Sequence, residues 1–263
     1  MKSITSAKFF ALALLLTGSF AAHAKATESV LIVAADGSNY PTTQLLGLDG
    51  ITTVSVYNSA SGTPTLAQLS GYDAVLAYTD SGPASPAGLG NVLEQYVNGG
   101  GTLVLGTYGI STPWEITGGI MTAGYSPLLD SGVNGSTSGH LVATVPSDAI
   151  FDGVNLSALA YFNNGNFAKP TLASGATLLA TDGNGVDMIA VNAAGNVYTD
   201  NLFPSTQGNS NNGQVYQLIA NELTGNGPRA SVPDAGSTAL LFGLGGLGLA
   251  LSARKRAARN HRA

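Results

Sequence analysis

The chain has 263 residues, 44% of them apolar, and a formal net charge of −5. Between Ala26 and Ser231 it carries 14 acidic residues against two basic ones, Lys169 and Arg229, so this body has a formal charge of −12. Nucleic acids and anionic lipids are bound mainly through Lys and Arg, which excludes both as partners of the body. The chain has no cysteine, which excludes disulfides, thiol nucleophiles and thiolate metal ligands.

Residues 1–24 are typical of a secretory signal peptide. Lys2 and Lys8 supply the charged region, an apolar stretch follows, and Ala22-His23-Ala24 is a small-residue cleavage site. A second Ala-x-Ala motif at 24–26 fits as well, so the sequence defines the cleavage position only to within two residues. The alternative is an uncleaved anchor, which the shortness of the apolar stretch disfavours. We therefore expect an exported protein.

The first half of the body alternates strand and helix patterns. The expected strands are 29–35, 51–57, 73–79 and 102–107, and the expected helices between them are 41–48, 65–69 and 86–98. In the last helix apolar residues recur at spacings of three and four, and Gly99 to Gly101 ends it. Such alternation predicts an α/β fold with a parallel sheet and right-handed crossovers.

The second half predicts a strand at 140–145, a strand at 176–181, a hairpin of 188–191 with 196–203, and a closing amphipathic helix at 214–223. The whole of 27–226 is expected to form one domain. Residues 227–236 then form a linker with a short Val-Pro-Asp box, 237–253 an apolar helix, and 254–263 a basic tail.

Several tracts of the body resemble the class I glutamine amidotransferase-like superfamily. They are a strand ending at Asp36, YDAVLAYTD from Tyr72, NVLEQYVNGGGTLVLGTYG from Asn91, VPSDAIFDGV from Val145, and GATLLATDGNG followed by NVYTDNLFP up to Pro204. The resemblance implies an open, mainly parallel sheet flanked by helices, as in flavodoxin-like and amidotransferase-like proteins.

Active members of that superfamily carry a cysteine at a strand-to-helix elbow and a late His-Pro-Glu. Here the elbow is Gly106-Thr107-Tyr108-Gly109, which puts Tyr108, or Thr107 if the register slips by one, at the nucleophile position. Phe203-Pro204-Ser205 stands where His-Pro-Glu is expected. The resemblance therefore implies a domain without amidotransferase or cysteine-peptidase activity, and we assign no catalytic residue.

Carboxylates remain as candidate ligand groups. Asp36 and Asp80 each end an expected parallel strand, where α/β folds place their ligand crevice, and Glu115 follows the elbow. With Asp200 nearby, these side chains could form a glycosidase-like acid pair or a cation site. The alternative is that Asp36 and Asp80 are turn residues that cap the following segments, which is the commoner role of aspartate at such places.

The remaining motifs give weaker evidence for a metal, catalytic or cofactor site. Asp182-Gly-Asn184-Gly-Val-Asp187 has part of a calcium-loop spacing but lacks its twelfth-position Glu and fits a hairpin turn better. His140 is expected to be a strand-start residue, because no G-x-S-x-G elbow accompanies it. Gly243-Leu-Gly-Gly-Leu-Gly248 matches a dinucleotide fingerprint only in letters, since no strand precedes it. The sequence thus indicates neither a resident metal nor a cofactor.

The tail has the order of a membrane-targeting signal: a box with Val232, Pro233, Asp234 and Gly236, an apolar run, and the basic residues Arg254, Lys255 and Arg256. The basic end would stay in the cytoplasm and the acidic body outside. This arrangement resembles the PEP-CTERM class of bacterial sorting signals in its Val-Pro-Asp variant. The resemblance implies an exosortase-type peptidase as partner, removal of the inner-membrane anchor, and transfer to the cell surface or extracellular matrix. A plain single-span anchor is the alternative.

Taken together, the sequence predicts a surface-sorted, non-catalytic binding or matrix protein associated with exopolysaccharide. The rival hypothesis is an envelope carbohydrate-active hydrolase that uses Asp36, Asp80 or Glu115.

Overall fold

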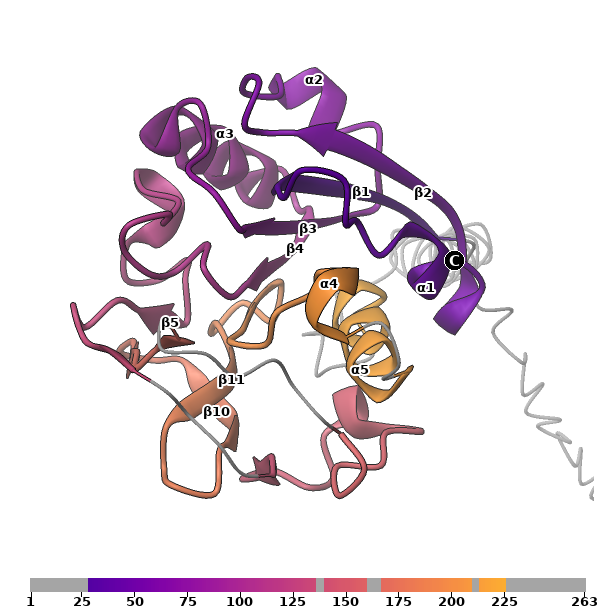
Figure 1. Ribbon diagram of the computed structural model, residues 1–263, viewed down its shortest axis with the longest axis vertical. Coiled ribbons are helices and arrows are strands. Elements are labelled where there is room, and N and C mark those ends of the chain that lie inside the picture. The colour runs from indigo at the N-terminus through magenta and orange to yellow at the C-terminus, as the bar shows by residue number, and fades with distance from the viewer. Residues whose placement is uncertain (1–27, 136–139, 160–166, 210–212, 226–263) are drawn as a thin grey trace, which may run out of the picture.

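The computed structural model describes residues 28–135, 140–159, 167–209 and 213–225 (Figure 1). The expected signal peptide, the Val-Pro-Asp box, the apolar segment and the basic tail all lie outside these residues. Within the described ranges no helix is long and apolar enough to cross a membrane.

The domain is built on one eight-stranded mixed sheet with the order β2-β1-β3-β4-β12-β11-β10-β7. Its strands are β1 (Glu28–Ala35), β2 (Ile51–Asn58), β3 (Ala74–Thr79), β4 (Thr102–Gly106), β7 (Val142–Ala143), β10 (Thr177–Thr181), β11 (Asp187–Val191) and β12 (Val197–Asp200). The pairs β1–β2, β1–β3, β3–β4 and β4–β12 are parallel, and β11, β10 and β7 continue the sheet in antiparallel pairs. The prediction of a mainly parallel sheet is confirmed, with an antiparallel extension at one side.

The parallel strands are central and buried on both faces. All residues of β3 and β4 are buried, as are the last six of β1. Continuous apolar runs are what such a position requires, because each successive side chain meets a layer of helices on one face or the other. β2 is exposed along much of its length because it lies at the edge of the sheet.

Helices cover both faces of the sheet (Figure 1). They are α1 (Thr42–Leu45), α2 (Leu66–Leu69), α3 (Pro86–Asn98), α4 (Thr206–Asn209) and α5 (Gly213–Leu223), together with the 3₁₀ turns η1 (Leu48–Gly50), η2 (Gly119–Met121) and η3 (Ala149–Phe151). The architecture within the described residues is therefore three layers, helices–sheet–helices.

One apolar layer lies between the sheet and α3. Leu89, Leu93 and Val97 of α3 pack with Leu31 and Val33 of β1 and with the matching residues of β3 and β4. α3 begins and ends where the sequence predicts. Ser85 caps its first turn by accepting a hydrogen bond from Gly88 N at 3.3 Å, and Pro86 occupies the first helical position.

The other layer lies between the sheet and α5. Val215, Leu218 and Ile219 of α5 pack with Ile32 of β1 and Leu76 of β3. Two amides fix the helix to its neighbours. The Asn221 Nδ2 donates to Ile150 O at 2.7 Å, and the Gln217 Nε2 donates to Asp49 Oδ2 at 2.6 Å. This layer reaches the carboxyl ends of the parallel strands.

The structure corrects three expected bounds. The strand expected at 140–145 is only Val142–Ala143, and the helix expected at 41–48 is the short α1 followed by η1. The strand expected to reach Phe203 ends at Asp200 because the Asp200 Oδ1 accepts a hydrogen bond from Leu202 N at 2.9 Å, which turns the chain out of the sheet. The hairpin of β11 and β12 is as predicted.

Two small antiparallel ribbons lie beside the main sheet. β5 (Leu128–Leu129) pairs with β9 (Thr171–Leu172), and β6 (Asn134–Gly135) pairs with β8 (Phe167–Ala168). They lie in the chain between β4 and β10, and each ribbon is only two residues long on either side.

Candidate functional site at the carboxyl ends of the parallel strands

The segments that follow β1, β3, β4 and β12 meet at one edge of the sheet, because parallel strands end on the same side. Backbone hydrogen bonds tie them together: Asp80 N donates to Ala35 O at 2.8 Å, and Thr107 N donates to Leu202 O at 3.1 Å. In open α/β sheets this edge is where ligand sites are found. Asp36, Asp80 and Tyr108, which the sequence singles out, follow these strands.

The turn after β4 contains a strained residue. Tyr108 has a φ of 60°, one of two positive-φ residues other than glycine in the described ranges. A bulky side chain in the left-handed region is disfavoured, so the surrounding structure must hold it there. β4 is followed by a turn at 107–110 and not by a helix, so the strand-to-helix elbow expected from the sequence is a tight turn here, with Tyr108 in it.

Tyr108 is surrounded by aromatic rings. Its ring centroid lies 5.1 Å from that of Phe203 and 5.4 Å from that of Trp114, and Phe203 also meets Tyr78 edge-on at 6.2 Å. Tyr108 and Phe203 are each 1% exposed. Tyr108 and Phe203, which the sequence suggests as counterparts of the nucleophile and the base, are thus in contact, and both side chains are packed as core.

Thr107 is a structural neighbour of the elbow. Its Oγ1 donates to Asn201 Oδ1 at 2.8 Å, and the Asn201 Nδ2 donates to Ala168 O at 3.0 Å, all with fully buried residues. This chain of hydrogen bonds joins the end of β4 to the segment after β12. A hydroxyl committed to a neighbouring amide in the core has no open path to a substrate.

Gly106 allows the close approach of the two segments. A Cβ at this position would lie 2.7 Å from the Pro204 Cγ and 2.9 Å from the Tyr78 Cβ. Real Cβ atoms do not approach carbon atoms so closely, so only glycine fits at the end of β4. The Pro204 ring is thereby held against the elbow, with Ser205 fully buried behind it.

Asp36 is the most buried of the candidate ligand residues, with 3% of its surface exposed. The Tyr78 hydroxyl donates to its Oδ2 at 3.0 Å. Burial raises the pKa of Asp36, and interactions with Ser205, Tyr78 and Asn39 oppose that rise. The Asp36 carboxyl also contributes to raising the pKa of Tyr78, for which burial is the larger cause. Asp36 is therefore more than an exposed turn residue.

Asp80 lies at the end of the neighbouring strand and is partly exposed. Burial raises its pKa, and the charge of Asp36 raises it further. The structure thus brings Asp36 and Asp80 within electrostatic reach of each other, as expected from the order of the strands. Ser81, next in the chain, donates from Oγ to Ala35 O at 3.1 Å and fixes the two turns to each other.

Glu115 lies in the segment after the elbow, beside Trp114, and is half-buried. Its Oε2 is buried and has no hydrogen-bond partner among the described residues. Neither of its oxygens is hydrogen-bonded to Asp36 or Asp80. Glu115 therefore shares the edge of the sheet with the aspartates but makes no described contact with them.

A buried carboxyl pair, Asp200 and Glu222, lies on the α5 side of the sheet, and sequence reasoning missed the second member. Both residues are 0% exposed. Burial raises the pKa of Asp200 to about 7, and burial together with the charges of Asp200 and Asp148 raises that of Glu222. A signal was present in the sequence: Glu222 lies three residues after Ile219, on the apolar face of its helix.

The other motifs are local structure. The Asp182 Oδ1 accepts hydrogen bonds from Asn184 N at 2.8 Å and Val186 N at 2.7 Å, so this loop is the hairpin turn between β10 and β11. His140 is exposed just before β7. Within the part of the chain that the structure describes, no three His, Asp or Glu side chains are grouped so that they could hold a metal ion.

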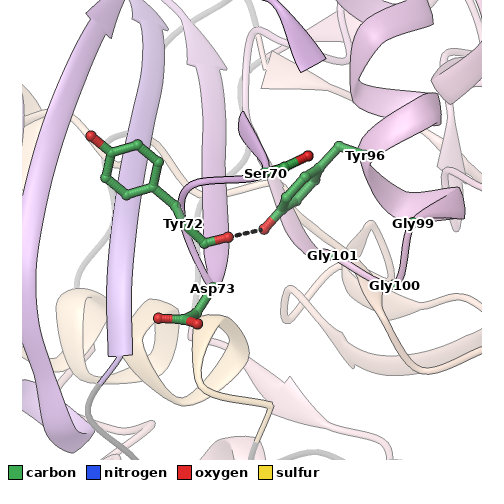
Figure 2. Close-up of a pocket in the computed structure, with 7 residues that line it drawn as sticks. All are labelled: Ser70, Tyr72, Asp73, Tyr96, Gly99, Gly100 and Gly101. Carbon is green, nitrogen blue, oxygen red and sulfur yellow. Dashed lines mark hydrogen bonds between the residues drawn. The ribbon is translucent and has the colours of Figure 1, made fainter. Parts of the chain in front are cut away.

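A pocket of about 270 Å³ opens at the opposite edge of the sheet, lined by Ser70, Tyr72, Asp73, Tyr96 and the Gly99–Gly101 turn (Figure 2). The Tyr96 hydroxyl donates to Tyr72 O at 3.2 Å, and the Asp73 Oδ2 accepts from Ser29 N and Oγ at 2.8 and 2.6 Å. Figure 2 shows the Asp73 carboxylate directed away from Tyr96. The polar side chains that line this pocket do not converge on one point. We therefore place the candidate site at the other edge of the sheet, at the carboxyl ends of the parallel strands.

Comparisons with known proteins find similarity at the level of the fold. Neither a protein-family model nor a curated protein matches the chain. The crystal structure of a ThuA-like protein from Bacteroides uniformis is similar with a TM-score of 0.51 and 14% identity, over 77% of this chain and 93% of that one. The crystal structure of a GMP synthase subunit from Thermoplasma acidophilum gives a TM-score of 0.45 and 12% identity, over 76% and 94% of the two chains.

The fold is amidotransferase-like. The resemblance expected from the tracts around Asp36, Tyr72, the elbow and Pro204 is thereby confirmed at the level of the fold. At such low identity the likeness says nothing of activity. What the amidotransferase-like domain can do chemically has to be argued from its own residues at the strand ends.

Proposed function

We propose that the chain is an exported, surface-sorted protein whose amidotransferase-like domain binds a ligand or serves as a matrix component and does no catalysis. The observation that carries the non-catalytic part is the ring contact of Tyr108 with Phe203, at the positions of the nucleophile and base. Acyl transfer at an elbow needs a nucleophile and a base within hydrogen-bond reach of each other. Two packed aromatic rings supply neither.

The destination of the protein is proposed from its ends. The Val232-Pro233-Asp234 box, the apolar run and the basic tail support recognition by an exosortase-type peptidase, which would cut near the box. The inner-membrane anchor would thereby be lost and the domain transferred to the cell surface. The ligand proposed there is neutral exopolysaccharide, because a body with a formal charge of −12 repels anionic polymers.

Binding and catalysis can be tested on the same sample. The full chain is incubated with exopolysaccharide purified from the producing bacterium, and retention on the insoluble polymer is measured alongside release of ammonia from glutamine. The proposal expects the folded chain to be retained, the urea-unfolded chain to pass through, and no ammonia above the protein-free blank. Equal passage of both forms would overturn the binding function, and ammonia release would overturn the non-catalytic one.

An envelope hydrolase acting on carbohydrate is the second candidate, and one observation favours it. Asp36 and Asp80 end adjacent strands, and the charge of one raises the pKa of the other. Two interacting carboxyls with unlike surroundings are the pattern that lets one act as acid while the other stays ionised. In this alternative Asp80 is the acid, because burial and the charge of Asp36 raise its pKa, and Asp36 stays ionised, because its Oδ2 accepts a hydrogen bond from the Tyr78 hydroxyl.

Release of reducing ends from exopolysaccharide tests this alternative. A hydrolase of this kind would lose activity by a factor of about 10² or more in Asp36→Asn and in Asp80→Asn, on the order of general acid–base effects. Asp152→Asn is the matched control, since Asp152 is exposed and its backbone carbonyl, not its carboxylate, holds Asn221. If the wild-type chain releases no reducing ends from exopolysaccharide, the hydrolase alternative is wrong.

A further inference from the structure

Asp200 and Glu222 are buried without the partners that carboxylates need. Asp200 ends β12, and Glu222 lies on the last turn of α5, which covers this face of the sheet. One oxygen, the Asp200 Oδ1, accepts a hydrogen bond from Leu202 N at 2.9 Å. The Asp200 Oδ2 and both Glu222 carboxyl oxygens are buried with no hydrogen-bond partner among the described residues.

Among the described residues, the elements packed around α5 add no positive charge. η3 brings Asp148, whose charge acts on Glu222, and η1 brings Asp49, which accepts from Gln217 of α5. The phenolic groups nearby are Tyr216 of α5 and Tyr78 of β3, which act on each other electrostatically. Lys169, the one Lys or Arg in the described ranges, is exposed beside Gly135 in the β6–β8 ribbon.

An ionised carboxylate in such a place loses its hydration without compensation, and two of them repel each other. Protonation removes both costs and provides a donor. The other way to remove these costs is to hydrate the carboxylates, which requires that the carboxyl-terminal turn of α5 leave the sheet. Its attachments there are apolar contacts and the hydrogen bonds from the Asn221 amide to Ile150 O and Asp152 O.

We propose that α5 is a pH-sensitive closure of the domain, docked on the sheet while Asp200 and Glu222 carry protons and opening at its carboxyl-terminal turn when they ionise. The device goes beyond the proposed binding function and does not depend on it. Opening would hydrate the two carboxyls and break the hydrogen bonds from Asn221 to Ile150 O and Asp152 O. It would also free the end of the described domain, because Glu222 lies three residues from Gly225.

The direction of the pH effect follows from proton linkage. The folded state binds these protons more tightly than the unfolded chain, whose Asp and Glu titrate near pH 4. Their stabilisation is therefore complete below about pH 4 and is lost as the pH rises through the folded-state pKa. With Asp200 at about 7, that carboxyl alone raises the opening equilibrium about a hundredfold between pH 5 and pH 8.

Hydrogen-exchange protection of the α5 amides, corrected for the intrinsic exchange rate, measures this opening in the full chain. In wild type, protection falls about a hundredfold or more from pH 5 to pH 8, while fluorescence of Trp114, packed on Tyr108, stays constant. In the Asp200→Asn, Glu222→Gln double variant the fall shrinks to less than about tenfold. Asp152→Asn, at an exposed carboxylate, behaves as wild type.

Equal protection of α5 at pH 5 and pH 8 in wild type would overturn the proposal, and so would the same fall in the double variant. Should the double variant fail to fold, ¹³C carboxyl NMR of the wild-type chain decides instead. Two carboxyls still protonated at pH 6 and assigned to Asp200 and Glu222 support the closure. Titration of both below pH 5 contradicts it.

Discussion

The Tyr108 ring lies 5.1 Å from the Phe203 ring, centroid to centroid, with the two planes tilted by 58°. The two residues are 95 positions apart, and they meet because β4 and β12 are adjacent parallel strands that end together. The turn after β4 therefore places a core aromatic at this edge of the sheet. The strain at Tyr108, with its φ of 60°, is compensated by ring packing on Phe203 and Trp114.

Truncation of this aromatic pair is expected to destabilise the domain strongly. Tyr108→Ala and Phe203→Ala should each lower the free energy of unfolding by about 3–5 kcal/mol, because each leaves a cavity in a fully packed site. A double-mutant cycle in urea should give a coupling of about 1 kcal/mol. Losses below about 1 kcal/mol for both would mean that the rings are not part of the core.

The close approach at the end of β4 gives a second prediction. Gly106→Ala should cost about 1–3 kcal/mol or prevent folding, because its Cβ would meet the Pro204 Cγ and the Tyr78 Cβ at under 3 Å. Gly82→Ala is the matched control, since a Cβ there meets nothing within 4 Å. Thermal unfolding of the two variants compares them directly. Similar midpoints for both would contradict the packing at the elbow.

The electrostatic link between Asp36 and Asp80 can be measured by titration. Asp36→Asn should lower the pKa of Asp80, because it removes the charge that raises it, while burial of Asp80 keeps part of the rise. The same variant should be less sensitive to pH in its stability, since the raised pKa of Asp36 makes wild type lose stability as the pH rises above about 4. Carboxyl NMR reads the first effect. If the pKa of Asp80 is the same in wild type and in Asp36→Asn, the two carboxyls do not interact and this prediction is wrong.

The turn of β10 and β11 distinguishes a cap from a calcium loop. Asp182→Ala should destabilise the domain by about 1–3 kcal/mol, because two backbone N–H groups lose their acceptor. Millimolar Ca²⁺ should leave the melting temperature of wild type unchanged. A rise in melting temperature that depends on Ca²⁺ and is lost in Asp182→Ala would restore the cation interpretation.

The central sheet is predictable from the sequence because its strands are buried on both faces. Continuous apolar runs such as that of β1 can only be satisfied between two layers of helices, and a turn residue such as Asp36 ends each run. α3 is predictable to the residue, since Ser85, Pro86 and the three glycines after Asn98 give its start and end. Packing over long distances adds little to elements whose local signals already agree.

The region between the elbow and β10 is not predictable in the same way. Its ribbons are two residues long and depend on pairing partners about 30 to 45 positions away, such as Leu128 with Leu172. At the site, Asp36 and Asp80 could be placed together from strand order alone. The hydrogen bond of Tyr78 to Asp36 and the burial of Glu222 depend on which face each side chain takes in the packed domain.

The most direct test of surface sorting is fractionation of the producing bacterium followed by mass spectrometry of the carboxyl terminus of the protein. Surface sorting predicts an extracellular or cell-surface form that begins near Ala24 and ends near Pro233, without the residues from 237 onward. An intact chain in the inner membrane that still ends in the basic residues after Arg254 would contradict it.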